Sequence, residues 1–253
     1  MAVEPVPDEA AAVADCGDER ALVVADYHAG LEVAIRYDGV EVRSRAADRR
    51  ERTRRLLART GADRVVFLGD LANAIGSPGR EERSELEELL AALTPRVPVT
   101  IVKGNHDGEI EAVVAGLDDG GEDVEVTDGS GTRIGSVGFA HGHTWPSRAV
   151  CSAPTVCVAH EHPTVRLEDE VGGRRVERAW LRGRLAPGPF VEHHGDLAVD
   201  GDLVVFPAFN ELTGGTWVNV DGQGFLSPFL PDGLADGEAY LLDGTRLGDY
   251  RRV

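Results

Sequence analysis

Short apolar runs and amphipathic stretches alternate along the first half of the chain. Runs of consecutive apolar residues predict strands buried on both faces, at residues 22–25, 65–68 and 97–102. Apolar residues at helical spacing predict helices at residues 45–60, 80–93 and 109–117, and Gly61 is expected to end the first of them. Alternating strands and helices are typical of a doubly wound sheet.

The pattern changes near residue 123, where short β-branched segments separated by Gly, Asp and Pro begin. Strands are expected there at residues 124–126, 134–140, 155–159, 164–167, 175–181, 203–207, 216–220 and 238–242. No linker separates the two halves, so we expect one domain over residues 1–253, with two packed sheets and helices outside. Residues 1–19 are expected to form a loose acidic lead-in, with a short strand near residues 11–14.

Polar residues follow five of the expected strands directly. In an open α/β sheet ligands bind at the carboxyl ends of the strands, so these junctions are expected to converge on one site. They are Asp26-Tyr27-His28, Gly69-Asp70, Gly104-Asn105-His106-Asp107, His141-Gly142-His143 and His160-Glu161-His162.

The residue types at these junctions favour a metal site. Asp, Asn and neutral His are ligands for Mn²⁺, Fe²⁺, Zn²⁺, Ni²⁺ or Co²⁺, and no thiolate is present. Asp-x-His or Gly-Asp alone is weak evidence for a metal site, since such residues are common in turns. Gly-Asn-His-Asp is more specific evidence, because a turn does not need the histidine. Two neighbouring cations can clamp a phosphoryl group and stabilise entering and leaving oxygens. The five junctions together therefore predict a two-metal phosphoesterase.

The order of these motifs resembles that of the calcineurin-like metallophosphoesterase superfamily over nearly the whole chain. The short form and the tail motif are similar to archaeal ICC-like phosphoesterases and to bacterial DNA-ligase-associated metallophosphoesterases. That tail is Phe206-Pro207-Ala208-Phe209-Asn210 with Gly214-Gly215. The resemblance implies an α/β fold, a four-layer α-β-β-α sandwich with two mixed sheets.

The resemblance also implies roles for individual residues. Asp26, His28 and His162 would hold the first metal, and Asn105, His141 and His160 the second, with Asp70 bridging both. His106 would contact the phosphate or protonate the leaving group, and Asp107 would orient His106. Two divalent ions are expected, with Mn²⁺ as the first candidate and Fe, Zn, Ni or Co as alternatives.

The chain departs from the family pattern at two positions. Ala159 stands where the last motif usually has glycine, a difference of one methyl group that leaves ligation expected. Asn73 stands where the family often has Asp or His, so it can contact substrate or bond within its loop, but it cannot act as an acid or base. His143 is a further candidate for a substrate or supporting contact rather than a ligand.

Charge narrows the choice of substrates. The net charge is −18, and Lys103 is the only lysine, which favours an acidic solvated surface like that of proteins from salt-loving archaea. No broad basic footprint for nucleic acid is evident. The arginines of residues 43–55 form one basic cluster, interpreted mainly as a solvated helix face, with a strand-binding patch as the alternative.

Several further expectations concern the setting of the protein. Cys16, Cys151 and Cys157 are expected to be free thiols. No apolar run approaches the roughly 20 residues that span a bilayer. The start of the chain lacks signal-peptide features, so a cytoplasmic protein without membrane contact is expected. The sequence leaves the oligomeric state open.

Three functions are weighed. The first is a phosphodiesterase, because a diester's alkoxide leaving group gains most from a proton supplied by His106. The resemblance to relatives linked to DNA repair implies that this phosphodiesterase is a nuclease. The second is a phosphomonoesterase or small-nucleotide phosphatase, which the acidic balance and single lysine favour. The third is a catalytically silent scaffold, which loss of ligands would mark, and none is lost.

Overall fold

A sheet of mixed strand directions forms the first half of the fold. The computed structural model describes residues 2–169, 171–220 and 222–253, and within them this sheet has the order β1-β2-β3-β4-β5-β6. Strands β3 to β6 pair in parallel, whereas β1 and β2 join as antiparallel strands. The strands are Val3–Pro5 (β1), Ala11–Asp15 (β2), Arg20–Ala25 (β3), Arg64–Leu68 (β4), Val99–Val102 (β5) and Val124–Thr127 (β6).

A second mixed sheet follows in the order β14-β13-β11-β12-β9-β8-β7, and β10 pairs with β11 beyond this path. Strand β9 pairs in parallel with β8 and β12, and the other pairs are antiparallel. The strands are Thr132–Ile134 (β7), Val137–Phe139 (β8), Thr155–Val158 (β9), Thr164–Glu168 (β10), Arg174–Leu185 (β11), Asp202–Val205 (β12), Leu234–Leu241 (β13) and Arg246–Asp249 (β14).

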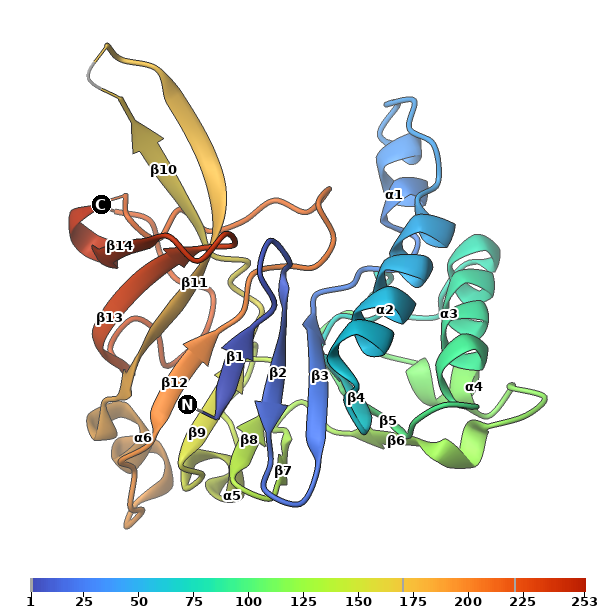
Figure 1. Ribbon diagram of the computed structural model, residues 1–253, viewed down its shortest axis with the longest axis horizontal. Helices are drawn as coiled ribbons and strands as arrows, with labels where there is room; N and C mark the ends of the chain where they lie inside the picture. The colour runs from blue at the N-terminus through green and yellow to red at the C-terminus, as the bar shows by residue number, and fades with distance from the viewer. Residues whose placement is uncertain (1, 170, 221) are drawn as a thin grey trace.

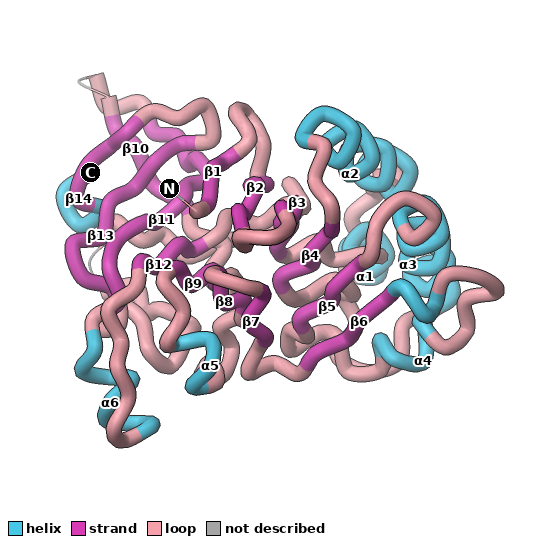
Figure 2. The backbone as a smooth tube through the Cα atoms, turned by 60° about the horizontal axis from the view of Figure 1, so that its bottom comes forward, coloured by secondary structure: helices cyan, strands magenta, loops and turns pink. Residues whose placement is uncertain are grey.

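Helices α1 to α4 lie along the outer side of the first sheet, and α5 and α6 lie at one end of the second (Figures 1 and 2). The helices are Leu31–Tyr37 (α1), Ala46–Thr60 (α2), Arg80–Leu93 (α3), Ile110–Val114 (α4), Arg148–Cys151 (α5) and Pro187–His194 (α6). This is the expected helix–sheet–sheet–helix sandwich with two mixed sheets.

Alternation along the strands divides the apolar side chains between three cores. In β3, Leu22 and Val24 pack toward the leucines of α2 and α3, while Val23 and Ala25 face the second sheet. In β9, Val156 and Val158 pack on the outer side of the second sheet, and Cys157 joins the core between the sheets. The sheets are therefore buried on both faces, which explains why their sequences read as continuous apolar runs.

Some predicted elements differ from the structure. The expected loose lead-in contains β1 and β2, because its alanines and valines complete the core between the sheets. Residues 216–220 form no strand, and Trp217 makes an isolated bridge to Thr164. The apolar stretch at 134–140 is split by a turn between β7 and β8. Gly61 ends α2 with φ of 59°, as predicted.

Two further expectations can be compared with the structure. Cys16, Cys151 and Cys157 are free and buried. Within the described residues, none of the helices combines the length and the apolar character needed to cross a bilayer.

Candidate metal centre

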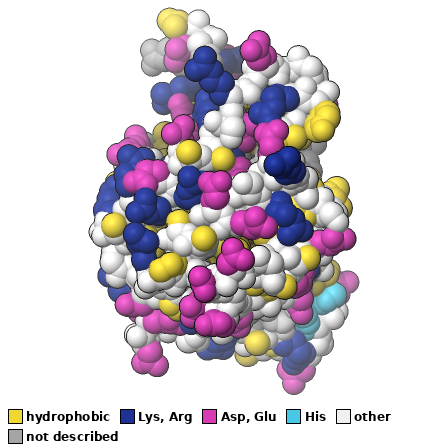
Figure 3. Space-filling view, turned by 90° about the vertical axis from the view of Figure 1, so that its right-hand side faces the viewer, with side chains coloured by type: hydrophobic (Ala, Val, Ile, Leu, Met, Phe, Trp, Pro, Cys, Tyr) yellow, Lys and Arg dark blue, Asp and Glu magenta, His cyan; other side chains and the backbone are white. Residues whose placement is uncertain are grey.

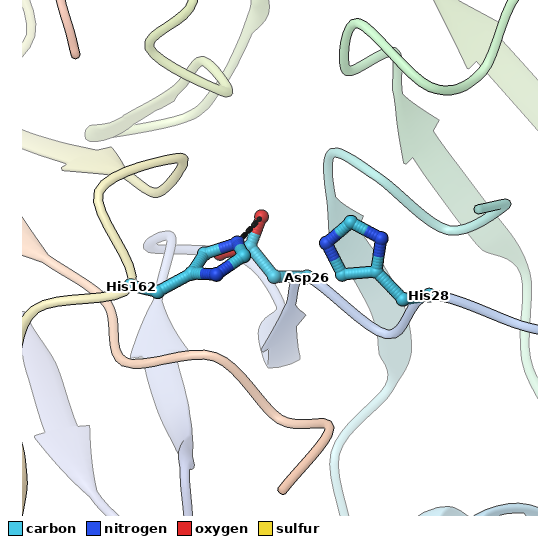
Figure 4. A group of neighbouring side chains, drawn as sticks. All are labelled: Asp26, His28 and His162. Atoms are coloured by element: carbon cyan, nitrogen blue, oxygen red, sulfur yellow. Dashed lines mark ion pairs between the residues drawn. The ribbon is translucent and has the colours of Figure 1, made fainter. Parts of the chain in front are cut away.

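Seven predicted ligands converge at the strand ends of both sheets. Asp26 and His28 follow β3, Asp70 follows β4, and Asn105 follows β5; His141 follows β8, and His160 and His162 follow β9. Within the described residues, two groups of three have ligand atoms within 4.8 Å of one another. The first group is Asp26, His28 and His162 (Figure 4), and the second is Asp70, His141 and His160.

Asp70 lies between the two groups. Its Oδ2 is 3.4 Å from His141 Nε2 in the second group and 3.8 Å from His28 Nε2 in the first. Asn105 joins the second group, with its Oδ1 3.3 Å from His141 Nε2. In the first group, Asp26 Oδ1 is 3.3 Å from His162 Nε2. One carboxylate therefore faces both groups, as a bridging ligand must.

The backbone is strained where ligands are presented. Asp26, His28, Asp70, His160 and His162 all have positive φ, between 43° and 71°. For residues other than glycine this left-handed region costs about 1–2 kcal/mol each, and such strain clusters at functional sites. Hydrogen bonds between the loops hold it in place, such as His28 N–H to the Asp70 carbonyl at 2.8 Å.

Two glycines allow the strand ends to approach one another. A Cβ on Gly69 would lie 2.0 Å from His141 Nδ1, and φ at Gly69 is +76°. A Cβ on Gly104 would lie 2.0 Å from Asp70 Oδ1. The Gly-Asp and Gly-Asn motifs therefore need glycine because a ligand side chain occupies the space that any larger residue would fill.

Buried atoms without partners indicate that these groups fit cations. Oδ2 of Asp26 and both ring nitrogens of His28 are buried and lack hydrogen-bond partners. Buried polar groups are normally satisfied by hydrogen bonds or by a metal. The donors are carboxylate or amide oxygens and imidazole nitrogens, a set that suits Mn²⁺, Fe²⁺, Zn²⁺, Ni²⁺ or Co²⁺.

The pKa values of the ligand rings fall into two classes. Burial lowers the pKa of His28 and of His160 to about 4, so both rings are neutral and offer a lone pair. Burial alone would lower the pKa of His162, but the Asp26 carboxylate raises it to about 9. Burial likewise opposes protonation of His141, yet Asp70 and Asp26 raise its pKa. A cation must therefore displace protons from His141 and His162.

Comparison with known proteins agrees with this geometry. Residues 19–206, most of the chain, match the family described as calcineurin-like phosphoesterase. The chain belongs to this family. Membership implies hydrolase activity on phosphoesters and the use of divalent metal ions. No curated protein sequence matches the chain closely enough to count as a relative.

Solved structures of similar fold include two bacterial proteins. The nuclease MPE of Pseudomonas putida has 20% sequence identity and a TM-score of 0.57, with 97% of this chain and 100% of that chain covered. The E. coli phosphoesterase Yfce has 15% identity and a TM-score of 0.42, with 90% of this chain and 96% of that chain covered. At this identity, the likeness to the nuclease shows a shared fold.

The motif of this calcineurin-like phosphoesterase places His106 beside the Asp70 carboxylate. His106 Nε2 is 4.0 Å from Asp70 Oδ2, and its backbone N–H donates to Asp70 Oδ1 at 2.9 Å. Its Nδ1 bonds the Asn73 carbonyl. Because a carbonyl can only accept, Nδ1 carries the proton and Nε2 faces the metal groups.

Asp107, which is expected to orient His106, bonds backbone groups rather than the His106 ring within the described residues. The buried Asp107 carboxylate instead accepts backbone N–H groups from Ala72 and Gly104, both at 2.8 Å, and from Leu71 at 3.3 Å. Burial raises the pKa of Asp107 to about 6, against the effect of these bonds. Asp107 therefore ties the loop after β4 to the loop after β5, and the Asn73 carbonyl contacts the His106 ring.

Asn73 and His143 remain candidates for substrate contacts. The backbone of Asn73 is fixed at both ends, since its N–H donates to Glu82 at 2.6 Å and its carbonyl meets His106. His143 lies outside both ligand groups, with its ring centroid 5.3 Å from that of His141, and its Nδ1 is buried without a partner. Ala159 is buried in the core between the sheets, and His160 and His162 still reach the groups.

Sequence reasoning missed the role of Glu161 in holding the ligand loops, a role that it shares with Asn210. Glu161 is buried between two ligand histidines, and its carboxylate accepts N–H groups from Ser227 at 2.6 Å and Leu226 at 2.9 Å. Asn210 donates its amide to the carbonyls of Tyr27 at 3.1 Å and His28 at 3.2 Å. The available signal for Glu161 was its acidic side chain between the two histidines of the His160-Glu161-His162 motif.

The arginine cluster of residues 43–55 is less solvated than expected. Arg49 is buried and bonds Glu32 at 2.6 Å and Glu85 at 2.7 Å. Glu85 also accepts the N–H of Gly30 at 2.9 Å, so this network supports the loop after β3. Arg52 is half-buried and pairs with Glu9. The prediction of a solvated face is wrong for these two arginines because acids from other elements pack against α2.

Proposed function

We propose that this protein is a two-metal phosphodiesterase that acts on nucleic acid. The observation that carries the proposal is the pair of ligand groups on either side of Asp70, with His106 beside the same carboxylate. The fold shared with a nuclease supports a nucleic-acid substrate, and the tail motif supports kinship with archaeal ICC-like and DNA-ligase-associated enzymes and a role in DNA repair. The core between the sheets supports one working domain over the whole chain.

Each ligand keeps the role that its position suggests. Asp26, His28 and His162 would hold one cation, and Asn105, His141 and His160 the other, with Asp70 touching both. When bound, two divalent cations supply Lewis acidity that neutralises phosphoryl oxygens and activates water as a nucleophile. Mn²⁺ is our first choice because the ligand set mixes carboxylate, amide and imidazole.

His106 is the group placed to handle the departing oxygen. Its Nδ1 proton is held by the Asn73 carbonyl, which fixes the ring and leaves Nε2 toward the ligand groups. As an imidazolium, His106 can donate a proton from Nε2 to the leaving alkoxide. Strained ligand backbones and the buried Asp107 tether hold these groups in place before substrate arrives.

Hydrolysis of bis-p-nitrophenyl phosphate, compared with p-nitrophenyl phosphate, tests the proposal. The assay contains Mn²⁺ and high salt, because the net charge of −18 suits a saline medium. We expect a strong preference for the diester and no activity in Asp70→Asn. A preference for the monoester would replace the proposal with the phosphomonoesterase reading that the acidic surface favours.

His106→Ala tests the proton-donor role. General acid catalysis is worth about 10²–10⁴-fold, so kcat on a diester with an alkyl leaving group should fall by that range while bound metal is retained. Nitrophenolate leaves readily without a proton, so its release should fall much less. An equal loss for both leaving groups would instead indicate that His106 serves only to bind phosphate.

A further inference from the structure

The segment that follows β12 lies against the first metal group from two sides. In Figure 1 it is the orange loop that leaves β12 and reaches toward α1 and α2. Near its start, Phe209 N–H donates to the Ala25 carbonyl at 2.8 Å, and Asn210 holds the Tyr27 and His28 carbonyls. Further on, the Gly214 carbonyl accepts from His162 Nδ1 at 3.0 Å. Side chains of this segment that face outward therefore lie at the rim of the metal centre.

Arginines from α2 and its N-terminus meet the first part of this segment. The Arg52 guanidinium lies 4.3 Å from the centroid of the Phe209 ring. Arg45 Nη1 is 3.4 Å from Glu211 Oε2, and Arg52 Nη1 is 3.4 Å from Glu211 Oε1. A pocket of about 230 Å³ opens here, and its lining includes Arg45, Arg52, Arg55, Phe209 and Glu211.

A tryptophan and another arginine meet the last part of the segment. The Trp217 side chain is 37% exposed, and the Arg166 guanidinium lies 5.8 Å from its ring centroid. The backbone of Trp217 forms a bridge to Thr164 of β10, and Arg166 is two residues further along that strand. The side chains of Thr164 and Arg166 therefore lie on the same face of β10, the face beside which Trp217 is paired. Strand β10 begins at Thr164, two residues after His162, so the backbone bridge from Trp217 meets the chain just beyond the loop that presents His162.

These contacts are unusual for a chain of net charge −18. On the helical face in Figure 3, arginines are interspersed with acidic side chains, so that face offers no continuous basic area. Around the segment after β12, arginines paired with Glu9 and Glu211 lie at one end, and an exposed aromatic ring lies beside Arg166 at the other. Single strands are bound by this combination, with cations along the backbone and aromatic rings that stack on bases.

We propose that Arg45, Arg52, Arg166 and Trp217, here called the strand rim, bind an unpaired nucleic-acid strand beside the first metal group. The inference rests on the proposed phosphodiesterase function and names its substrate more narrowly. Trp217 stacks on a base, which it can do only where that base is unpaired. The arginines contact phosphates on either side of the scissile bond, with Arg166 also backing the indole.

Glu211 is the residue that a phosphate displaces. Its side chain is 53% exposed, and both of its arginine contacts are long. A phosphate oxygen can therefore take its place on Arg45 and Arg52 without uncovering a buried charge. The proposal thus predicts opposite signs for two neighbouring changes: loss of an arginine weakens strand binding, and loss of the Glu211 charge strengthens it.

The test measures binding of a fluorescently labelled single-stranded oligodeoxynucleotide by anisotropy, in Mn²⁺ at several salt concentrations. Trp217→Ala should weaken binding by about 5- to 100-fold, and Trp217→Phe should restore most of it. Arg166→Gln and Arg45→Gln should each reduce the slope of log K against log salt by about 0.7, the value for one phosphate contact on a single strand. Glu211→Gln should tighten binding several-fold.

Arg96→Gln is the matched control, because it removes an exposed arginine between α3 and β5, at the opposite ends of the strands. The same variants are assayed on bis-p-nitrophenyl phosphate, which is too small to reach the rim. Unchanged diester hydrolysis with weakened strand binding is the expected result. Strand affinity of Trp217→Ala equal to wild type overturns the inference and leaves the proposed function standing. Wild-type failure on the diester, with strand binding still dependent on Trp217, overturns the proposed function alone.

A duplex of the same sequence completes the test. We expect Trp217→Ala to leave its affinity unchanged, since its bases are paired and stacked. If the variant weakens duplex and single strand equally, Trp217 makes a general contact and the assignment to unpaired strands is wrong. If wild type binds neither nucleic acid but binds an acidic peptide, the rim serves a protein partner and the inference is also wrong.

Discussion

Removal of the Glu161 carboxylate should weaken both the fold and the binding of both cations. Glu161→Ala leaves the N–H groups of the exposed Leu226 and the buried Ser227 without their acceptor. An unsatisfied buried donor costs about 1–3 kcal/mol, so the loss at Ser227 should lower the free energy of unfolding by about 1–3 kcal/mol. Because His160 and His162 flank Glu161 and belong to different groups, each cation should lose about 10-fold or more in affinity.

Glu161→Gln is the informative partner variant. Its amide oxygen can still accept the two N–H groups, and its NH₂ can donate to the hydroxyl of Thr216, which bonds the carboxylate at 3.2 Å in the wild type. We therefore expect a loss of only about 1 kcal/mol, the net value of an ordinary hydrogen bond. Glu192→Ala, an exposed change on α6, should alter neither property.

Thermal unfolding and calorimetric titration with Mn²⁺ measure these effects. For a chain of this size each kcal/mol shifts the midpoint by about 2–4 °C. Unfolding in excess chelator isolates the contribution of the hydrogen bonds, and titration then reports metal affinity alone. Wild-type midpoint and wild-type affinity in Glu161→Ala would refute the reasoning. A lower midpoint with unchanged affinity would confine Glu161 to stability.

Three other predictions concern the ligand loops. Gly69→Ala should lower the free energy of unfolding by about 2–5 kcal/mol, because of left-handed backbone strain and overpacking against His141. It should also reduce metal binding at the second group. The control Gly61→Ala, which is also left-handed but has open space around it, should keep metal binding. Arg49→Met should destabilise the fold by about 3–5 kcal/mol, seen in chemical denaturation, because Glu32 and Glu85 would lose their buried partner; wild-type stability would refute this. Cation binding at pH 7 should release protons, since the pKa of His162 is raised to about 9, and affinity should rise with pH up to about that value; binding heats that are equal in buffers of different ionisation enthalpy would contradict it.

The sequence predicts the strands of the sheet centre and the convergence of their polar ends because both depend on local patterns. Runs such as residues 65–68 are apolar throughout since both faces of the sheet are covered. The residues that follow then meet because parallel strands end at one edge. The methyl of Ala159, a departure from the family pattern, lies in the core between the sheets.

Contacts between distant segments could not be predicted in the same way. From the sequence alone, Glu161 is expected at the surface. Its burial is explained only by its hydrogen bonds to the backbone of Leu226 and Ser227, which are distant in sequence. Arg49 lies in a helix rich in arginine, and its burial depends on acids from α1 and α3. Asp107 is next to His106 in sequence, yet two of the three N–H groups that its carboxylate accepts belong to another loop. In each case the partner is set by tertiary packing.

Each ligand group draws side chains from both sheets, which couples the chemistry to the mechanics of the molecule. Asp26 and His28 belong to the first sheet and His162 to the second, while Asp70 belongs to the first and His141 and His160 to the second. A cation in either group would link side chains of the two sheets, and it can bind all of them only when the sheets are packed together. Any opening of that interface would release both ions together, so metal loss reports separation of the sheets before the strands themselves unravel.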